Sequence, residues 1–96
     1  MRRYFYYILD SEVPFLKKGQ VFLSEKHIAE DWDGRPLKKG EVGSMALYDE
    51  EEKAFKRVEV KYLGYADFKD EKDLQENGIK KIEEKLKEFG LNGEAQ

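Results

Sequence analysis

The residues that could do chemistry in this 96-residue chain begin with its single histidine, His27. An imidazole can act as a general base, but the chain has no cysteine for it to activate and no serine in an obvious partner position. A histidine exposed on a short helix is the simpler interpretation, given the ordinary exposure of His at protein surfaces. The sequence therefore favours a protein that is not an enzyme.

Acidic residues are plentiful, but they do not form a recognisable metal site. Asp31 with Asp33, and Asp67 with Asp70, are pairs that lack the number of ligands required by Ca²⁺ or Zn²⁺. The eight glycines form neither a G-x-G-x-x-G fingerprint nor a Walker phosphate loop. We therefore expect no bound metal and no cofactor.

The segment 27–40 has the composition of a binding site. Its candidate binding residues are one histidine, one tryptophan and three cations, namely His27, Trp32, Arg35, Lys38 and Lys39. An indole beside cations can offer stacking and charge to a small anion, a nucleotide or an acidic protein surface. The simpler interpretation is that Trp32 fills the core beneath the loop while the cations stay in water, because Trp is highly buried on average.

These side chains need a scaffold, and its clearest element is a long β-hairpin over residues 41–65. Charged and apolar residues alternate without a fault over residues 57–62, which is the period of a strand with one face in water. Residues 49–53 form a charged connection of hairpin length.

A helical interpretation of the same stretch competes with the hairpin. Four apolar residues have the spacing of a helical stripe, namely Phe55, Val58, Tyr62 and Tyr65. A helix would enclose Gly64 at a cost of about 1 kcal/mol relative to Ala, and alternating Val and Tyr suit a pleated surface better. We favour the strand, with a bulge at residues 63–64 where the alternation changes phase.

Before the hairpin we expect two strands and one short helix. Arg3–Leu9 is an unbroken run of bulky residues, which predicts a strand covered on both faces or placed at an oligomer seam. Residues 20–23 predict a short strand. Ser24 is a good N-cap for a helix over residues 25–31, which would carry an acid in its first turn.

After the hairpin, a stripe of apolar residues predicts a C-terminal helix over residues 71–89, with Asp70 as its N-cap. Asn and Gly at residues 77–78 could break or kink this helix. Gly90 is a natural residue to end it. Residues 91–96 are expected to form a flexible tail.

Together these elements predict a single α+β domain over residues 1–90. Its sheet would be a small antiparallel one of four or five strands, or a partly open barrel that resembles an SH3-like barrel at the level of the fold. The inserted helix over residues 25–31 and the C-terminal helix over residues 71–89 would accompany the sheet.

For function we expect a non-catalytic binding protein that acts through a protein–protein surface, such as an accessory or inhibitory factor of a phage or other mobile element. Self-association into a homo-oligomer is also expected, because so short a chain leaves apolar area to cover. The absence of cysteine and of any apolar run of membrane-spanning length predicts a cytoplasmic protein that does not enter a membrane.

Two alternatives to a protein-binding function stay open. The first is sequestration of a small anionic ligand such as a nucleotide by the tryptophan and cations of segment 27–40, between subunits in one version. The second is single-stranded nucleic-acid binding through the aromatic run Tyr4–Tyr7. A net charge of −3 makes nucleic acid the weaker alternative, since such grooves are normally basic.

Overall fold

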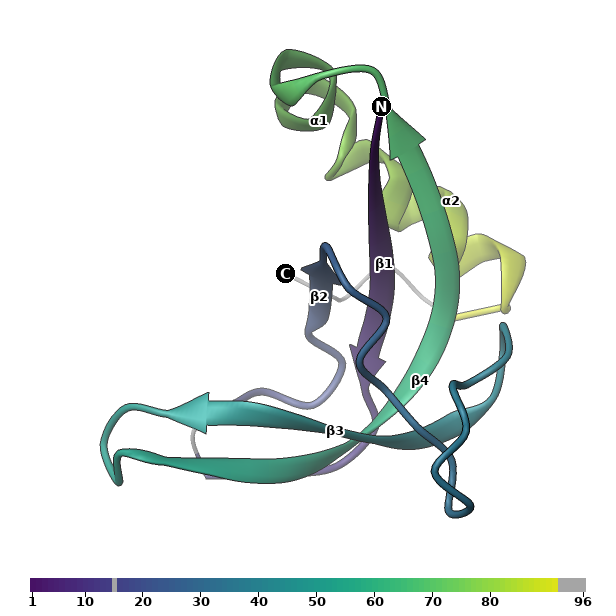
Figure 1. The fold of residues 1–96 in the computed structure, drawn as a ribbon. Helices are drawn as coiled ribbons and strands as arrows, with labels where there is room; N and C mark the ends of the chain where they lie inside the picture. Colours follow the sequence, from purple (N-terminus) through teal and green to yellow (C-terminus); the bar gives the residue numbers. More distant parts are fainter. Residues whose placement is uncertain (15, 92–96) are drawn as a thin grey trace.

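The computed structural model of the chain describes residues 1–14 and 16–91. These residues form β1 (Arg2–Leu9), β2 (Val21–Ser24), β3 (Val42–Asp49), β4 (Ala54–Phe68), α1 (Glu71–Asn77) and α2 (Lys80–Glu88). The strands make one antiparallel sheet in the order β2-β1-β4-β3, in which the outer strands β2 and β3 do not pair with each other (Figure 1). The predicted α+β fold with a small, open antiparallel sheet is confirmed.

β4 is the strand around which the sheet is built, and its two halves have different neighbours. Residues 54–61 pair with β3, and residues 60–68 pair with β1. The predicted hairpin is therefore confirmed, and its helical alternative is wrong. Far from β1, the turn end of the hairpin extends away from both helices (Figure 1).

A β-bulge interrupts β4 within its pairing with β1, just beyond the last residue that pairs with β3. Gly64 lies opposite Tyr6 whereas Tyr62 lies opposite Tyr7, which leaves Leu63 as an extra residue. Gly64 has a φ of +95°, a conformation that glycine adopts without steric penalty. The bulge predicted at this pair of residues is confirmed.

Both faces of β1 are covered, as predicted for its run of bulky residues. On one face lie the helices, and the buried members of the core there are Tyr6, Leu63, Phe68 and Leu86. On the other face lies the segment between β2 and β3, which crosses in front of the sheet in Figure 1. The buried members of the core on that face are Tyr7, Leu9, Ala29, Leu37, Met45, Val58, Val60 and Tyr62.

Two helices take the place of the single helix predicted over residues 71–89. Asp70 caps α1 as predicted, because its side chain accepts a hydrogen bond from the Asp73 N–H at 2.9 Å. The N–H of Gly78 donates to the Leu74 carbonyl at 2.8 Å and closes α1, so the break expected at this glycine is confirmed. Among the described residues, neither helix is long and apolar enough to cross a membrane.

α2 ends in a Schellman motif. Gly90 has a φ of +67°, and its N–H donates to the Lys87 carbonyl at 3.1 Å, while the Leu91 N–H donates to the Leu86 carbonyl at 2.9 Å. Leu91 packs against the helix-side core. The first residue of the predicted tail is thus fixed by contacts, and residues 92–96 lie outside the described residues.

Residues 25–31 are not helical, so the short helix predicted there is wrong. The Ser24 hydroxyl accepts a hydrogen bond from the Lys26 N–H at 3.2 Å and makes a local turn instead of a helix cap. The N–H and carbonyl of Glu30 bond to the carbonyl and N–H of Ser44 in β3, each at 3.0 Å. At Glu30, pairing with the sheet therefore replaces the bonds that a helix would make along its own backbone.

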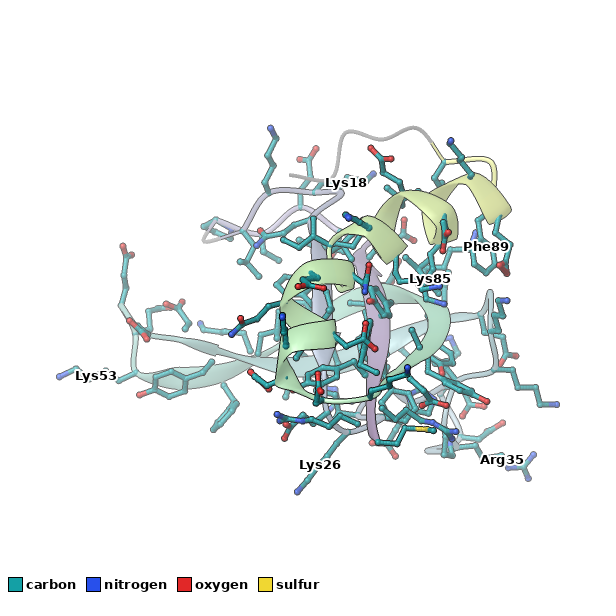
Figure 2. All side chains as sticks on the ribbon, turned by 90° about the horizontal axis from the view of Figure 1, so that it is seen from above. Lys18, Lys26, Arg35, Lys53, Lys85 and Phe89 are labelled. Atoms are coloured by element: carbon teal, nitrogen blue, oxygen red, sulfur yellow. The ribbon has the colours of Figure 1, made fainter. Side chains whose placement is uncertain are left out.

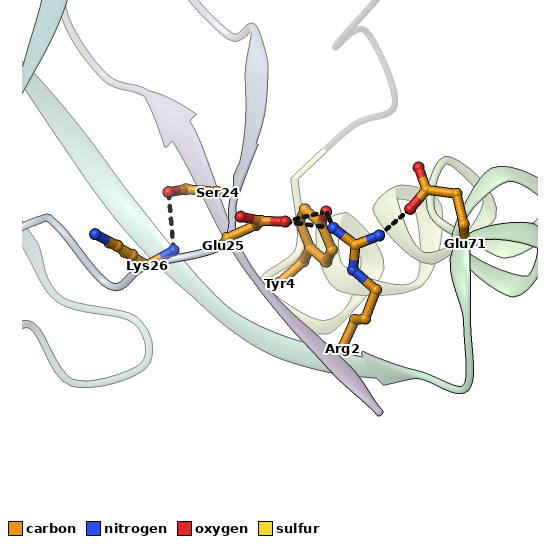
Figure 3. A network of polar contacts seen from close by, with 6 residues as sticks. All are labelled: Arg2, Tyr4, Ser24, Glu25, Lys26 and Glu71. Carbon is orange, nitrogen blue, oxygen red and sulfur yellow. Dashed lines mark hydrogen bonds and ion pairs between the residues drawn. The ribbon is translucent and has the colours of Figure 1, made fainter.

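An arginine joins three elements at the start of β1 (Figure 3). Arg2 pairs with Glu25, which follows β2, and with Glu71, the first residue of α1. The Tyr4 hydroxyl donates to the same Glu25 carboxylate at 2.9 Å. Hydrogen bonds from Arg2 and Tyr4 lower the pKa of the Glu25 carboxyl. Because these groups are exposed, each ion pair adds little stability, but together they fix how the segment after β2 and the first helix lie on β1.

Candidate functional site

His27 is packed against the sheet, so the prediction of an exposed histidine on a helix is wrong. Its Nε2 lies 2.8 Å from the Leu37 carbonyl oxygen, and its Nδ1 lies 2.7 Å from the Tyr7 hydroxyl. A carbonyl can only accept, so Nε2 carries the proton, and Nδ1 of the neutral ring accepts from the tyrosine. Both ring nitrogens are thereby engaged.

The His27 ring also belongs to a covered ring cluster, which we define as Phe5, Tyr7, His27 and Tyr62. Its centroid lies 4.3 Å from that of Tyr62 and 5.2 Å from that of Phe5, with the rings stacked. Burial raises the pKa of Tyr7 to about 12, so this hydroxyl stays protonated and can donate. The same hydroxyl accepts from the Ile28 N–H at 3.1 Å. The arrangement anchors a loop and offers no free base.

Trp32 and Arg35 lie on an exposed turn of the segment between β2 and β3. The Asp31 carboxylate accepts from the N–H groups of Asp33 and Arg35, both at 2.9 Å, and so closes this turn. Trp32 is 79 % exposed, so the expectation that it fills the core is wrong. Arg35 extends outward at the edge of the molecule (Figure 2).

Lys38 and Lys39 lie later in the same segment, and they do not border the same hollow as Trp32. They line an open groove of about 620 Å³ together with Tyr62, Gly64 and Tyr65, which we call the bulge groove. A Cβ added to Gly64 would lie 3.3 Å from the side-chain carbons of Lys39, so the bulge lets this lysine cross close to β4. Trp32 instead borders a hollow with Ser11, Val13, Ser44, Arg57, Val58 and Glu59.

The structure thus brings the two predicted lysines together with two tyrosines that the sequence had not singled out as binding residues. The bulge places Tyr62 and Tyr65 on one face of β4, since both rings contact Phe5, at 6.3 Å and 6.1 Å between centroids. Arg3 adds a guanidinium 4.0 Å from the Tyr65 ring centroid. The change of phase at the bulge was the signal that could have identified the two tyrosines.

A second exposed feature was also missed, at the turn end of the β3–β4 hairpin. Tyr48 and Phe55 lie directly opposite each other on the two strands, with their rings edge to face and their centroids 5.2 Å apart. Tyr48 is 50 % exposed and Phe55 is 72 % exposed. We call this pair the hairpin patch. The adjacent turn is fixed by Asp49, whose carboxylate accepts from the Glu51 N–H at 3.0 Å.

These groups can recognise a partner or a ligand through stacking, charge and hydrogen bonding. Within the described residues, no His, Asp and Glu side chains gather in threes or more to hold a metal ion. Comparison of this chain with protein families, curated proteins and solved structures finds no match to any of them.

Proposed function

We propose that this protein is a non-catalytic binding protein that recognises another protein through the hairpin patch of Tyr48 and Phe55. The observation that carries the proposal is the exposure of two facing aromatic rings at the projecting end of the hairpin. Aromatic side chains are enriched among the few residues that dominate the energy of protein interfaces. Because the two strands hold the rings in place, little conformational entropy is lost when the rings bind a partner.

The charge beside the hairpin patch indicates what the partner surface should carry. Three exposed acids, Glu50, Glu51 and Glu52, form the turn next to the two rings. Of these, Glu52 pairs with Lys56 at 2.8 Å. We therefore expect an apolar pocket edged by Lys or Arg on the partner, with complex formation that becomes slower as salt is added.

The engagement of His27 supports a role in binding and not in catalysis. A general base needs a free nitrogen within reach of a substrate proton, and both nitrogens of His27 are used inside the protein. A protein of this kind would act as an accessory or inhibitory factor whose effect depends on occupying its partner.

The test is affinity capture from lysate of the cells that express the protein, with the double variant Tyr48→Ser/Phe55→Ser beside the wild type. A partner bound through the hairpin patch should be recovered at a stoichiometric level by the wild type and be lost with the double variant. The matched control is Ile79→Ser, because Ile79 is 75 % exposed and lies between the two helices. If capture were due only to nonspecific binding by exposed apolar residues, the double variant and Ile79→Ser would both reduce it.

Sedimentation of the purified protein distinguishes a foreign partner from a second copy of the chain. A dimer that Phe55→Ser dissociates would identify the second copy as the occupant of the hairpin patch. Recovery of the same proteins with the double variant as with the wild type, together with an unchanged solution mass, would refute the proposed surface.

A further inference from the structure

The bulge groove contains the hydroxyl of an otherwise buried tyrosine, and this hydroxyl points to a ligand. Tyr62 is only 6 % exposed, yet it lines the groove with Lys38, Lys39 and Tyr65. No described residue makes a hydrogen bond to its hydroxyl. Among the described residues, no polar side-chain atom that is closed off from solvent lacks a partner. The Tyr62 hydroxyl is therefore the part of the side chain that reaches the groove.

Around this hydroxyl the groove is cationic, and one of its cations has no acidic partner. Lys39 pairs with Glu88, and the Arg3 guanidinium donates to Asp67 at 2.8 Å and 3.2 Å. No carboxylate in the described part of the chain lies within ion-pair distance of the Lys38 ammonium group. This ammonium group can therefore accept an anionic ligand without first breaking an internal pair.

The Tyr62 hydroxyl has the right protonation state to complement such a cation. Burial raises the pKa of Tyr62, so the hydroxyl is protonated at neutral pH and can donate to an anion. The volume of about 620 Å³ is that of a small-molecule site and exceeds the space that a bare ion occupies. Tyr65 is half-exposed at the wall, where it can contact a planar or apolar group.

We propose that the bulge groove binds a small organic phosphate. Its phosphate group accepts from the Tyr62 hydroxyl and pairs with Lys38, while its organic part lies along Tyr65. A phosphate monoester is favoured over a singly charged anion. One of its negative charges pairs with Lys38, and the exposed ion pair of Lys39 with Glu88, which adds little stability, can open so that Lys39 engages the second charge. This site is separate from the hairpin patch, so either proposal can fail without the other.

The test is a titration of the isotopically labelled protein, followed by backbone amide NMR, with three probes: adenosine monophosphate, adenosine and inorganic phosphate. We expect adenosine monophosphate to shift the amide signals of residues 38–39 and 62–65 saturably, with adenosine and inorganic phosphate much weaker. Probe concentrations up to roughly 10 mM cover the millimolar affinities of an open site.

Two variants test whether the Tyr62 hydroxyl and the Lys38 ammonium group bind the phosphate. Tyr62→Phe removes only a hydroxyl that has no described internal partner, so it should leave the melting temperature unchanged while weakening binding by roughly tenfold. Lys38→Gln should weaken binding to a similar degree, whereas Lys53→Gln, at the far end of the hairpin (Figure 2), should have no effect.

Three results would overturn the proposal. The first is no saturable shift with adenosine monophosphate. The second is equal binding by the wild type, Tyr62→Phe and Lys38→Gln. The third is binding of inorganic phosphate as tight as that of the monophosphate, which would show that the groove holds an ion only.

Discussion

Two groups of aromatic side chains on one sheet have opposite environments. The covered ring cluster lies beneath the segment between β2 and β3, whereas the hairpin patch lies in solvent. Each group contains two rings that face each other across neighbouring strands, Tyr7 with Tyr62 and Tyr48 with Phe55, and Tyr62 and Phe55 even belong to the same strand, β4. The period of a strand therefore decides on which face a ring lies, but the covering segment decides whether the ring is buried.

Two of the attachments that hold the covering segment on the sheet can be tested directly. Its His27 is bonded to Tyr7 in the sheet, and its Glu30 pairs with Ser44 in β3. The hairpin patch has no comparable cover among the described residues. The difference between the two groups can be tested by pH and by substitution.

The largest effect is expected at alkaline pH, where two covered tyrosines ionise. Burial raises the pKa of Tyr6 and of Tyr7 from 10.0 to about 12. The unfolded chain therefore loses these protons first, so the contribution of the two tyrosines to stability is constant below pH 10 and is lost as the pH rises from 10 to about 12. Urea denaturation followed by circular dichroism at several pH values measures this decrease. The variant Tyr7→Phe should show a shallower decrease, and an unchanged pH profile would contradict the assignment.

The substitution His27→Ala should destabilise the protein by about 3 kcal/mol, because it removes the ring stack and leaves the Leu37 carbonyl without its partner. The matched control in the hairpin patch is Phe55→Ala, which should change the free energy of unfolding by less than about 0.5 kcal/mol. Urea denaturation of both variants measures the difference. If both variants lost a similar free energy of unfolding, the covering segment would not explain the difference between the covered ring cluster and the hairpin patch.

The substitution Gly43→Ala tests the second attachment of the covering segment. A Cβ at this position would lie 2.2 Å from the Glu30 carbonyl oxygen, so the segment must move away from β3 at a cost of about 2 kcal/mol. Hydrogen exchange should become faster at the Glu30 and Ser44 amides and stay unchanged at the hairpin turn. Equal protection in the variant and the wild type would rule out a close approach of these backbones.

The smallest effect separates two tyrosine hydroxyls. Tyr7→Phe removes the bonds to His27 and to the Ile28 N–H and should destabilise the protein by about 1.5 kcal/mol. Tyr48→Phe removes a hydroxyl of the hairpin patch that has no described partner and should have no measurable effect. Thermal unfolding of the two variants measures the difference in stability. An equal loss of stability in Tyr7→Phe and Tyr48→Phe would argue against the bonds assigned to Tyr7.

The elements that the sequence predicts correctly are those whose signals are local. Alternation over residues 57–62 and the change of phase at Gly64 identify the hairpin and its bulge, and Asp70 and Gly90 mark helix ends through their own backbone chemistry. The predicted helix over residues 25–31 failed because backbone groups of this segment bond to distant partners that no local pattern reveals. Glu30 bonds to Ser44 in β3, and the Ile28 N–H bonds to the Tyr7 hydroxyl in β1.

The candidate site is predicted less completely, for the same reason. Lys38 and Lys39 are neighbours in sequence and share the bulge groove, but its tyrosines come from β4, and the Arg3 side chain that lies over Tyr65 comes from β1. Trp32 was expected to be buried because tryptophan usually is, and the turn that carries it instead projects into solvent. Average burial describes a residue type and not its place in a particular loop.

The exposure of Trp32 has a practical consequence for spectroscopy. As the only indole in the chain, it emits from a water-like environment in the folded and unfolded protein alike, so intrinsic fluorescence is a poor reporter of denaturation. The same indole is a sensitive reporter of docking, because any partner that covers its turn will shift the emission to shorter wavelength.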